Sequence, residues 1–555
     1  MTESVAPMAF DNRRTEAARA FLRTVVVVDD KPVRRSPQQP PAQVVQPVAG
    51  TRPPIGASQD RPSPIEVVAT PPSTSTANAP AEDPTHELDG DALQAAFADE
   101  GLVCSVLFGK KPTDDQEAKD WIKRVVTVGS RTDVLVLDWS WNGDHGVFCK
   151  QMIDALLKTD SCRRQLVIIY TAEDDKQVFE TRLTSSSESS SDSPREQPQP
   201  RVTSDTLRFS WPDHGLDVVV VQKFSARGED FYRGSKVREK DLPERVFKLF
   251  GEVCGGLLAN AAMHGLGHLR ESTHGILRRF RPELDAPYVV HRACSSPRES
   301  AQEQVRDLLV DALGDALTGS EVTKHLDDAP VEAWLKTCDG IADRWAKIDG
   351  LKGRPSHDAL ANGSLDTRNT KRKTVVAMTE ALVVSESSTE STPKRDHALA
   401  EFIYCADETG KHEPALRLGT ILSTANGGDL LVCTVPLCDS DRVPATGQKF
   451  PFLPLTTTSE SGSLALTIPG SKDIWYVPVN VCQLTMLKFV PPRDQTPVRA
   501  QKEADGFVFT DDSRDEYRYV GRLRPLFAQR LAQELGAKAA RVGVAESEFI
   551  RRRDK

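Results

Sequence analysis

Four short apolar segments, spaced far apart along the chain, constrain its fold more than any other feature. They span residues 25–30, 134–138, 166–172 and 218–223, and each is an unbroken apolar run that ends in polar residues. Such runs are typical of strands that are buried on both faces, as in a parallel sheet flanked by helices. The sequence therefore predicts a doubly wound α/β domain.

Two low-complexity segments explain the wide spacing of these runs. Residues 31–85 are rich in Pro, Gln, Ser and Thr, and residues 185–205 are rich in Ser, Pro and Gln. Both contain too little apolar surface to offset the entropy of ordering, so we expect two disordered inserts. With the inserts set aside, the pattern of a strand followed by a helix repeats five times. This pattern predicts a five-stranded parallel sheet within residues 20–240.

The rest of the 555-residue chain is expected to form further units, because a chain of this length exceeds a single core. Residues 241–350 have helical periodicity and begin with a long helical pattern over 242–280. Residues 351–396 are predicted to form a polar linker, interrupted by an apolar stretch at 375–384. Residues 397–555 are predicted to form an α+β domain, with a β-hairpin that turns at the Asn-Gly-Gly of residues 426–428.

Composition limits the cellular compartment and the classes of binding partner that we expect for this chain. A net charge of -9 argues against nucleic acid as the main partner of the whole chain. The ten cysteines include no CxxC pair, which indicates reduced thiols. No apolar run reaches the ~20 residues of a membrane helix, and the N-terminal residues do not resemble a secretory signal. We therefore expect a cytoplasmic protein that does not contact a membrane.

The polar residues that end the predicted strands are expected to gather in one pocket. In parallel sheets, side chains at the carboxyl ends of the strands line the ligand crevice. The residues that these ends contribute are Asp29, Asp30, Asp138, Thr171 and Lys223. Three acids, a hydroxyl and an amine together indicate a site for a divalent cation and a phosphoryl group.

On these residues the N-terminal region resembles the receiver domain of bacterial two-component response regulators, which has a flavodoxin-like fold. Residues 29–32 (Asp-Asp-Lys-Pro) resemble the acidic pair and proline that close the first strand of that family. Asp138 occupies the phospho-acceptor position, and Gly146 lies where the family opens its third helix. Residues 171–172 (Thr-Ala) resemble the switch hydroxyl and small residue after the fourth strand, and Lys223 resembles the lysine that ends the fifth.

The resemblance implies a phosphorylation chemistry with Mg²⁺ as cofactor. Asp138 is the implied phospho-acceptor, and Thr171 and Lys223 are expected to contact the phosphoryl group. The implied Mg²⁺ ligands are Asp29, Asp30, Asp138 and the backbone carbonyl of Ser140. The phosphoryl donor is expected to be a histidine kinase or a phosphotransfer protein, and the phosphorylated domain is expected to control the C-terminal output domain. A second copy of the chain, in a homodimer, is a further candidate partner.

The sequence departs from the family pattern at positions that concern signal relay. The residue after the acceptor is Trp139 instead of Met, and the residue after Lys223 is Phe224 instead of Pro. Val220 stands where the family often has an aromatic residue. We therefore expect the relay of the signal to differ from that of the family.

Other hypotheses remain open on the sequence. The receiver could be a degenerate scaffold beside a DNA-binding or interaction region in residues 240–555. An effector enzyme could instead place a nucleophile at Cys438, next to Asp439, although no separate catalytic site is predicted. His264 and His268 have the i, i+4 spacing of a metal pair or a phosphotransfer helix, but ordinary helix histidines are the favoured interpretation.

Overall fold

The structure is a computed structural model, in which two compact units comprise residues 1–268 and 269–555. Each unit is described by itself. The residues that the structure describes are 9–30, 32–33, 88–109, 112, 114–141, 143–159, 164–173, 176–184, 199–203, 206–211, 214–226, 230–231, 235–295, 299–338, 340–348, 360, 372–382, 392–406, 413–424, 427–458, 464–468, 475–493, 496–504 and 506–540.

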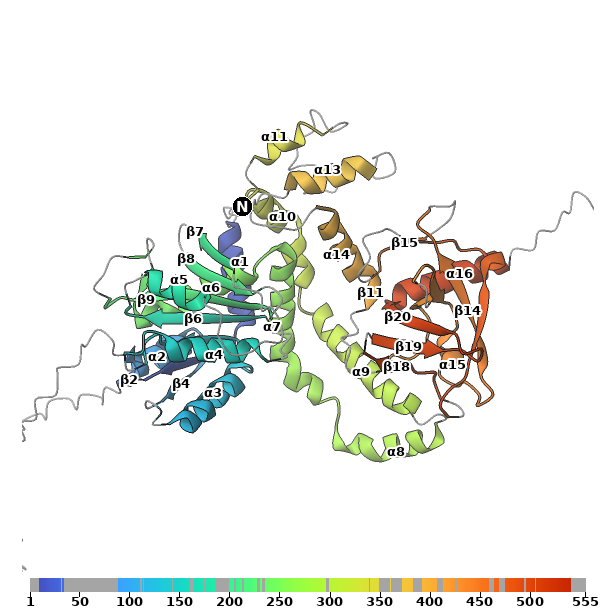
Figure 1. The fold of residues 1–555 in the computed structure, drawn as a ribbon, viewed down its shortest axis with the longest axis horizontal. Coiled ribbons are helices and arrows are strands. Elements are labelled where there is room, and N and C mark those ends of the chain that lie inside the picture. The colour runs from blue at the N-terminus through green and yellow to red at the C-terminus, as the bar shows by residue number, and fades with distance from the viewer. Residues whose placement is uncertain are drawn as a thin grey trace, which may run out of the picture. The chain divides into compact units, whose positions relative to one another are not determined.

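The first unit is built on a parallel sheet that confirms the predicted fold class (Figure 1). Its parallel strands lie in the order β4-β1-β5-β6-β9. Their bounds are Val103–Phe108 for β4, Thr24–Asp29 for β1, Val134–Leu137 for β5, Gln165–Thr171 for β6 and Leu216–Lys223 for β9. All five strands run in one direction, so their carboxyl ends meet at one edge of the sheet.

Both faces of this sheet are covered by helices, which explains the unbroken apolar runs. Alternate residues of β1 enter different cores: Val25 and Val27 lie in one apolar cluster, and Val26 and Val28 in the other. The first core is covered by α1 (Phe10–Phe21), α2 (Gly90–Asp99) and α6 (Leu242–Cys254), and the second by α3 (Asp115–Gly129), α4 (Val147–Leu157) and α5 (Lys176–Thr184). The sequence analysis did not predict α1.

The sheet extends beyond the five predicted strands. β8 (Thr206–Trp211) pairs antiparallel with β9, and β7 (Gln199–Thr203) pairs antiparallel with β8. The short strand β10 (Lys236–Val237) pairs parallel with β9. The prediction of five strands is therefore incomplete, and residues 199–203 belong to a strand and not to the second insert. Backbone pairing with β8 gives this polar segment an order that its composition did not indicate.

Most of the two predicted inserts lies outside the described residues. Within the first insert the structure describes only β2 (Pro32–Val33), which pairs parallel with β3 (Leu88–Asp89). The backbone is thus paired at both ends of this insert.

The helical pattern predicted over residues 242–280 is divided between two helices. α6 ends at Cys254 and α7 spans Leu257–Leu277. Gly255 between them is extended, with φ -75° and ψ 137°, because two successive glycines favour helix poorly. Between residues 285 and 404, the α-helices that the structure describes are α8 (Asp285–Cys294), α9 (Glu299–Thr318), α10 (Asp328–Leu335), α11 (Ile341–Trp345), α13 (Arg372–Leu382) and α14 (Thr392–Tyr404). No helix in the described ranges is both long and apolar enough to cross a membrane.

The C-terminal part of the second unit is a sheet with a helix, as predicted. The expected hairpin is formed by β12 (Thr420–Thr424) and β13 (Leu430–Cys433), with Ile421 opposite Val432. The strand order is β17-β14-β13-β12-β20-β19-β18, with β11 beside β20. The other elements described in this part of the chain are β11 (Cys405–Ala406), α15 (Leu437–Ser440), β14 (Gln448–Leu455), β15 (Leu464–Leu466), β16 (Trp475–Val477), the 3-10 helix Val481–Gln483, β17 (Thr485–Phe489), β18 (Gln501–Glu503), β19 (Gly506–Thr510), β20 (Glu516–Leu523) and α16 (Pro525–Ala539).

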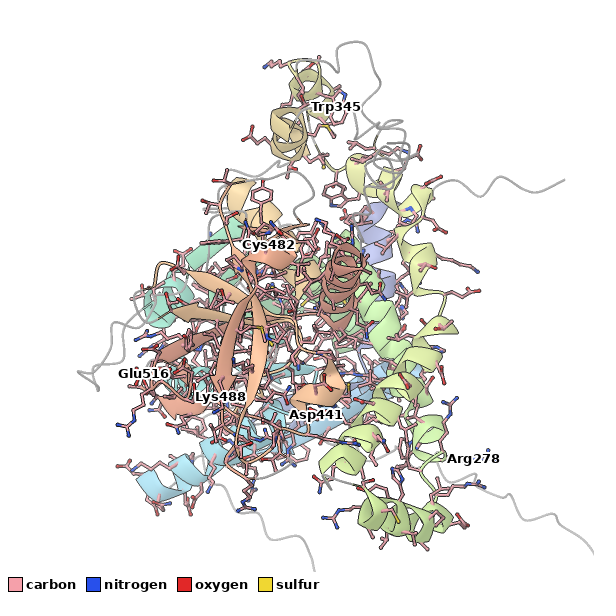
Figure 2. The ribbon with its side chains drawn as sticks, turned by 90° about the vertical axis from the view of Figure 1, so that its right-hand side faces the viewer. Arg278, Trp345, Asp441, Cys482, Lys488 and Glu516 are labelled. Carbon is pink, nitrogen blue, oxygen red and sulfur yellow. The ribbon has the colours of Figure 1, made fainter. Side chains whose placement is uncertain are left out.

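This sheet, like the first, is apolar on both faces. One face packs with α16 in a cluster that includes Ile421 and Leu531, and the other carries an aromatic cluster around Phe489. Figure 2 shows the side chains, with Lys488 on β17 and Glu516 at the start of β20.

Candidate functional site

At the carboxyl edge of the parallel strands, Lys223 contacts two of the predicted pocket acids, Asp29 and Asp138. The Nζ of Lys223 lies 3.3 Å from Oδ2 of Asp29 and 3.2 Å from Oδ1 of Asp138. β1 ends at Asp29 and β9 ends at Lys223, and the residue that follows β5 is Asp138. The lysine side chain is only 1% exposed, and both acids are buried. The pocket therefore contains a buried lysine between two carboxyl groups.

The charge balance of this cluster is negative. Burial raises the pKa of Asp138 to about 7; Lys223 opposes this rise, while Asp29 and Asp30 add to it. Burial alone lowers the pKa of Lys223, but Asp138 and Asp29 outweigh it, so the pKa of the lysine is raised. The lysine thus stays charged at neutral pH, and Asp138 keeps its proton to a higher pH than an ordinary carboxyl group does.

Asp30, Thr171 and Ser140 follow or end strands at the same edge of the sheet as this cluster. Asp30 is half-buried directly after β1, and its charge acts on Asp138. Thr171 is buried at the end of β6, where its hydroxyl accepts a hydrogen bond of 3.0 Å from the backbone N–H of Glu173. Ser140 is half-buried in the loop after Asp138. The threonine hydroxyl is therefore held by its own loop and not by a carboxyl group of the pocket.

The loop after Asp138 is held by Asp144, an acid to which no role was assigned from the sequence. The carboxylate of Asp144 accepts hydrogen bonds from three backbone N–H groups, those of Trp141 (2.9 Å), Gly146 (3.1 Å) and Phe148 (2.8 Å). Acids are common near the start of a helix, where they bind free backbone N–H groups, so the sequence carried this signal. The carboxylate fixes the turn that leads from the acceptor position into α4.

Trp139 places a second constraint on the same loop. It is fully buried, and its ring centroid lies 4.5 Å from that of Phe179 on α5. Gly146 has φ +84°, and a Cβ at this position would lie 2.2 Å from the Trp139 ring. Only glycine combines this backbone angle with so close an approach. The packing of Trp139 between Phe179 and Gly146 thus fixes the start of the loop after Asp138.

An exposed contact joins the loop after Asp138 to the loop after Thr171. His145 follows Asp144, and the Nδ1 of His145 lies 3.7 Å from Oε2 of Glu173. The histidine side chain is 70% exposed, so this pair is well solvated and contributes little to stability.

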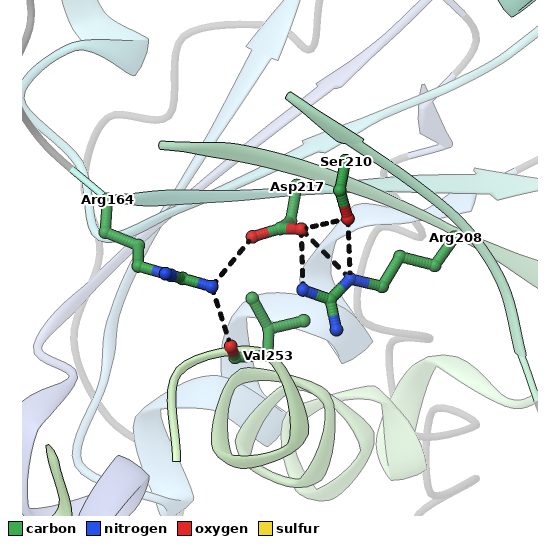
Figure 3. Close-up of polar contacts among 5 residues, drawn as sticks. All are labelled: Arg164, Arg208, Ser210, Asp217 and Val253. Atoms are coloured by element: carbon green, nitrogen blue, oxygen red, sulfur yellow. Dashed lines mark hydrogen bonds and ion pairs between the residues drawn. The ribbon is translucent and has the colours of Figure 1, made fainter. Parts of the chain in front are cut away.

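The opposite end of β9 carries a second buried ionic cluster (Figure 3). Oδ1 of Asp217 accepts hydrogen bonds from Nε (2.9 Å) and Nη2 (2.7 Å) of Arg208 and from the hydroxyl of Ser210 (2.6 Å). Arg164 reaches Oδ2 of Asp217 at 3.4 Å and donates to the carbonyl of Val253 at 2.9 Å. This cluster joins the added strand β8 and the end of α6 to β9.

Two metal sites were considered from the sequence, the histidine pair on α7 and the acidic pocket. Within the described ranges, no group of three or more His, Cys, Asp and Glu side chains is arranged to hold a metal ion. His264 and His268 on α7 accordingly have no third ligand of these types there. In the pocket, Lys223 occupies the space between Asp29 and Asp138. The oxygen donors and the excess negative charge of this pocket nevertheless have the chemistry that Mg²⁺ requires.

The thiol of Cys438 does not have the properties of a nucleophile. It is exposed and donates a hydrogen bond of 3.3 Å to Asp439, which raises the pKa of the thiol. A reactive cysteine requires the opposite shift, because the thiolate is the nucleophile. This geometry counts against the effector-enzyme hypothesis at this position.

Comparison with known families gives a match within the first unit. Residues 21–212 match the family model described as the response receiver domain. Comparisons with curated proteins and with solved structures gave no match. The matched region ends before β9, yet β9 pairs with β6 along its length and supplies Lys223 to the cluster.

Proposed function

We propose that Asp138 is phosphorylated by a histidine kinase or a phosphotransfer protein. The N-terminal part of this chain is a receiver domain, and this family supports a response-regulator-like signalling role. The observation that carries the proposal is the contact of Lys223 with both Asp29 and Asp138. A cation buried between two acids can pair with a phosphoryl oxygen once one acid has reacted.

The proposed reaction is the transfer of a phosphoryl group from a phosphohistidine. An oxygen of deprotonated Asp138 forms a bond to phosphorus while the phosphorus–nitrogen bond of the donor breaks, and the leaving imidazole takes up a proton. Lys223 stays protonated and neutralises one oxygen of the transferred group. The hydroxyl of Thr171, which accepts from the backbone N–H of Glu173, donates its own hydrogen bond to a phosphoryl oxygen.

Mg²⁺ is the cofactor that fits this pocket. The residues proposed to hold it are Asp29, Asp30 and Asp138, together with the backbone carbonyl of Ser140. A divalent cation at this place neutralises the charge that accumulates when a phosphoryl group approaches three acids. The raised pKa of Asp138, to which Asp29 and Asp30 both contribute, supports this need for another cation.

The proposed consequence of phosphorylation is control of the C-terminal unit. A degenerate scaffold is less well supported, because Asp29, Asp138 and Lys223 are all present and in contact. Neither a homodimer nor a nucleic-acid complex forms part of this proposal.

The proposal is tested by incubating the full chain with acetyl phosphate and Mg²⁺ and measuring the mass of the intact protein. We expect the wild type to gain one phosphoryl group and Asp138→Asn to gain none. Asp99→Asn is the matched control, because Asp99 is exposed and ends α2, four residues before the amino end of β4 at Val103, whereas the pocket residues lie at the carboxyl ends of the strands. Equal labelling of Asp138→Asn, or no labelling of the wild type, contradicts the proposal.

A further inference from the structure

Tyr170 lies directly beneath the pocket on the face of the sheet that carries Lys223. The register of β6 and β9 places Tyr170 opposite Val221. Residues two apart on a strand share a face, so the side chain of Lys223 emerges above the same core. The Nζ of Lys223 lies 5.8 Å from the centroid of the Tyr170 ring. The ring therefore forms part of the floor under the buried ammonium group.

The hydroxyl of Tyr170 contacts a different strand. It donates a hydrogen bond of 2.8 Å to the backbone carbonyl of Val237 on β10. The same carbonyl accepts a hydrogen bond of 3.0 Å from the backbone N–H of Phe224, the residue after Lys223. From β10 the chain continues through the short 3-10 helix Glu239–Asp241 into α6. One side chain thus touches the pocket lysine with its ring and the path to α6 with its hydroxyl.

The surroundings of Tyr170 restrict its movement and keep its hydroxyl protonated. The residue is 2% exposed, within the core that α6 covers. Burial raises the pKa of the phenol, and the charges of Glu239, Asp241 and Asp29 raise it further, so the hydroxyl remains a donor. A side chain in so dense a core has little room to move independently of its neighbours.

We propose that Tyr170 is a positioning residue that couples the position of Lys223 to β10 and α6, an inference that rests on the proposed phosphorylation of Asp138. When Asp138 carries a phosphoryl group, the Lys223 ammonium exchanges carboxylate contacts for a phosphoryl oxygen. The Tyr170 ring shifts with the ammonium above it, and its hydroxyl carries the displacement to the Val237 carbonyl. The start of α6 then changes its stability.

Two variants separate the ring from the hydroxyl. Tyr170→Phe keeps the ring and removes only the hydrogen bond, and the Val237 carbonyl retains the Phe224 N–H as a partner, so the fold is preserved. Tyr170→Leu also removes the aromatic face under Lys223. Tyr517→Phe in the second unit is the matched control, because Tyr517 is also a buried tyrosine, and its hydroxyl bonds to Asp511.

The measurement is hydrogen exchange of the backbone amides of residues 236–254 in the full chain, with and without beryllofluoride and Mg²⁺. In the wild type and in Tyr517→Phe, we expect the analogue to change exchange there by about 5- to 10-fold, the equivalent of one hydrogen bond. In Tyr170→Phe the analogue still binds with wild-type affinity, but this change is lost. In Tyr170→Leu the affinity for the analogue also falls, by about fivefold, because the contact between the cation and the ring is lost.

Each result gives a decision. If Tyr170→Phe binds the analogue and hydrogen exchange in residues 236–254 still changes as in the wild type, the coupling role of the hydroxyl is overturned. If the wild type binds the analogue without any change in residues 236–254, the proposed route is also overturned, while the proposed function survives. If the wild type binds no analogue, the proposed function fails, and the coupling fails with it.

Discussion

The two ends of β9 carry buried ionic clusters of opposite composition. At the start of the strand, Asp217 lies between Arg164 and Arg208, with the hydroxyl of Ser210 as a further donor. At its end, Lys223 lies between Asp29 and Asp138. The first cluster surrounds one acid with donors, whereas the second surrounds one cation with acids.

This difference distinguishes a cluster that stabilises the fold, around Asp217, from one that is suited to chemistry, around Lys223. The acid at the start of β9 has its charge neutralised and its oxygens hydrogen-bonded, so the cluster is complete without a ligand. At the end of β9, the pKa of Asp138 is raised to about 7 by burial and by the two neighbouring acids, although Lys223 opposes the rise. Perturbed groups of this kind mark functional sites more often than balanced ion pairs do.

The largest effect on stability is expected at the start of β9, where the charge of Asp217 is balanced by arginines; we call this the balanced end and the Lys223 cluster the acidic end. Asp217→Ala leaves Arg208 without its carboxylate, and breaking a buried pair in this way costs about 3–5 kcal/mol in the free energy of unfolding. Arg164 adds little to this cost, because its side chain is 55% exposed and returns to water. The side chain of Arg208 is only 19% exposed, so water replaces the lost contact poorly. Urea denaturation of the wild type and variant measures this loss.

The same variant tests the separation of the two ends. We expect Asp217→Ala to bind beryllofluoride and Mg²⁺ as the wild type does, at a urea concentration where both are folded. Weaker binding of the analogue by the folded variant would show that the clusters are coupled through β9, and the contrast drawn between them would not hold.

A smaller effect is expected from pH at the acidic end. The pKa of Asp138 is about 7 in the folded chain, against an ordinary value of 3.8. The folded state therefore binds the proton more tightly than the unfolded state, and this contribution to stability is lost as pH rises toward 7. Between pH 5 and pH 8 we expect the metal-free protein to lose about 2–3 kcal/mol from this group.

Asp138→Asn isolates that contribution, because asparagine does not titrate. Urea denaturation in the presence of EDTA is compared for the wild type and variant at pH 5 and pH 8. The variant is expected to be less sensitive to pH by the stated amount. An equal loss in both proteins would mean that Asp138 is not the group whose pKa is raised.

The acidic end was more predictable from sequence than the balanced end. Strands buried on both faces appear as unbroken apolar runs, so the residues that end them, such as Asp29 and Lys223, could be assigned to one edge. The partners of Asp217 could not, because Arg208 and Ser210 lie on a strand that the analysis missed. β8 alternates Leu207, Phe209 and Trp211 with polar residues, a period-two signal that was available.

Other features depended on tertiary structure that sequence patterns do not contain. The partner of the Tyr170 hydroxyl is a carbonyl in the two-residue strand β10, which is too short to show any periodicity. In the second unit, β14 contains Pro451 and Pro454, residues that argue against a strand inside a sheet. In each case the neighbouring strands, and not the local sequence, decided the structure.

The smallest effect tests how complete the balanced cluster is. Ser210→Ala removes the 2.6 Å hydrogen bond to Oδ1 of Asp217 but leaves both bonds from Arg208 to the same oxygen. Because the acid keeps its charged partners, we expect a loss of only about 1 kcal/mol in the free energy of unfolding, measured by urea denaturation. A loss as large as that of Asp217→Ala would mean that the hydroxyl holds Arg208 in place as well as the acid. The serine Oγ does lie 3.1 Å from the Arg208 Nε, so the size of the loss distinguishes a cluster held by charge from one held by geometry.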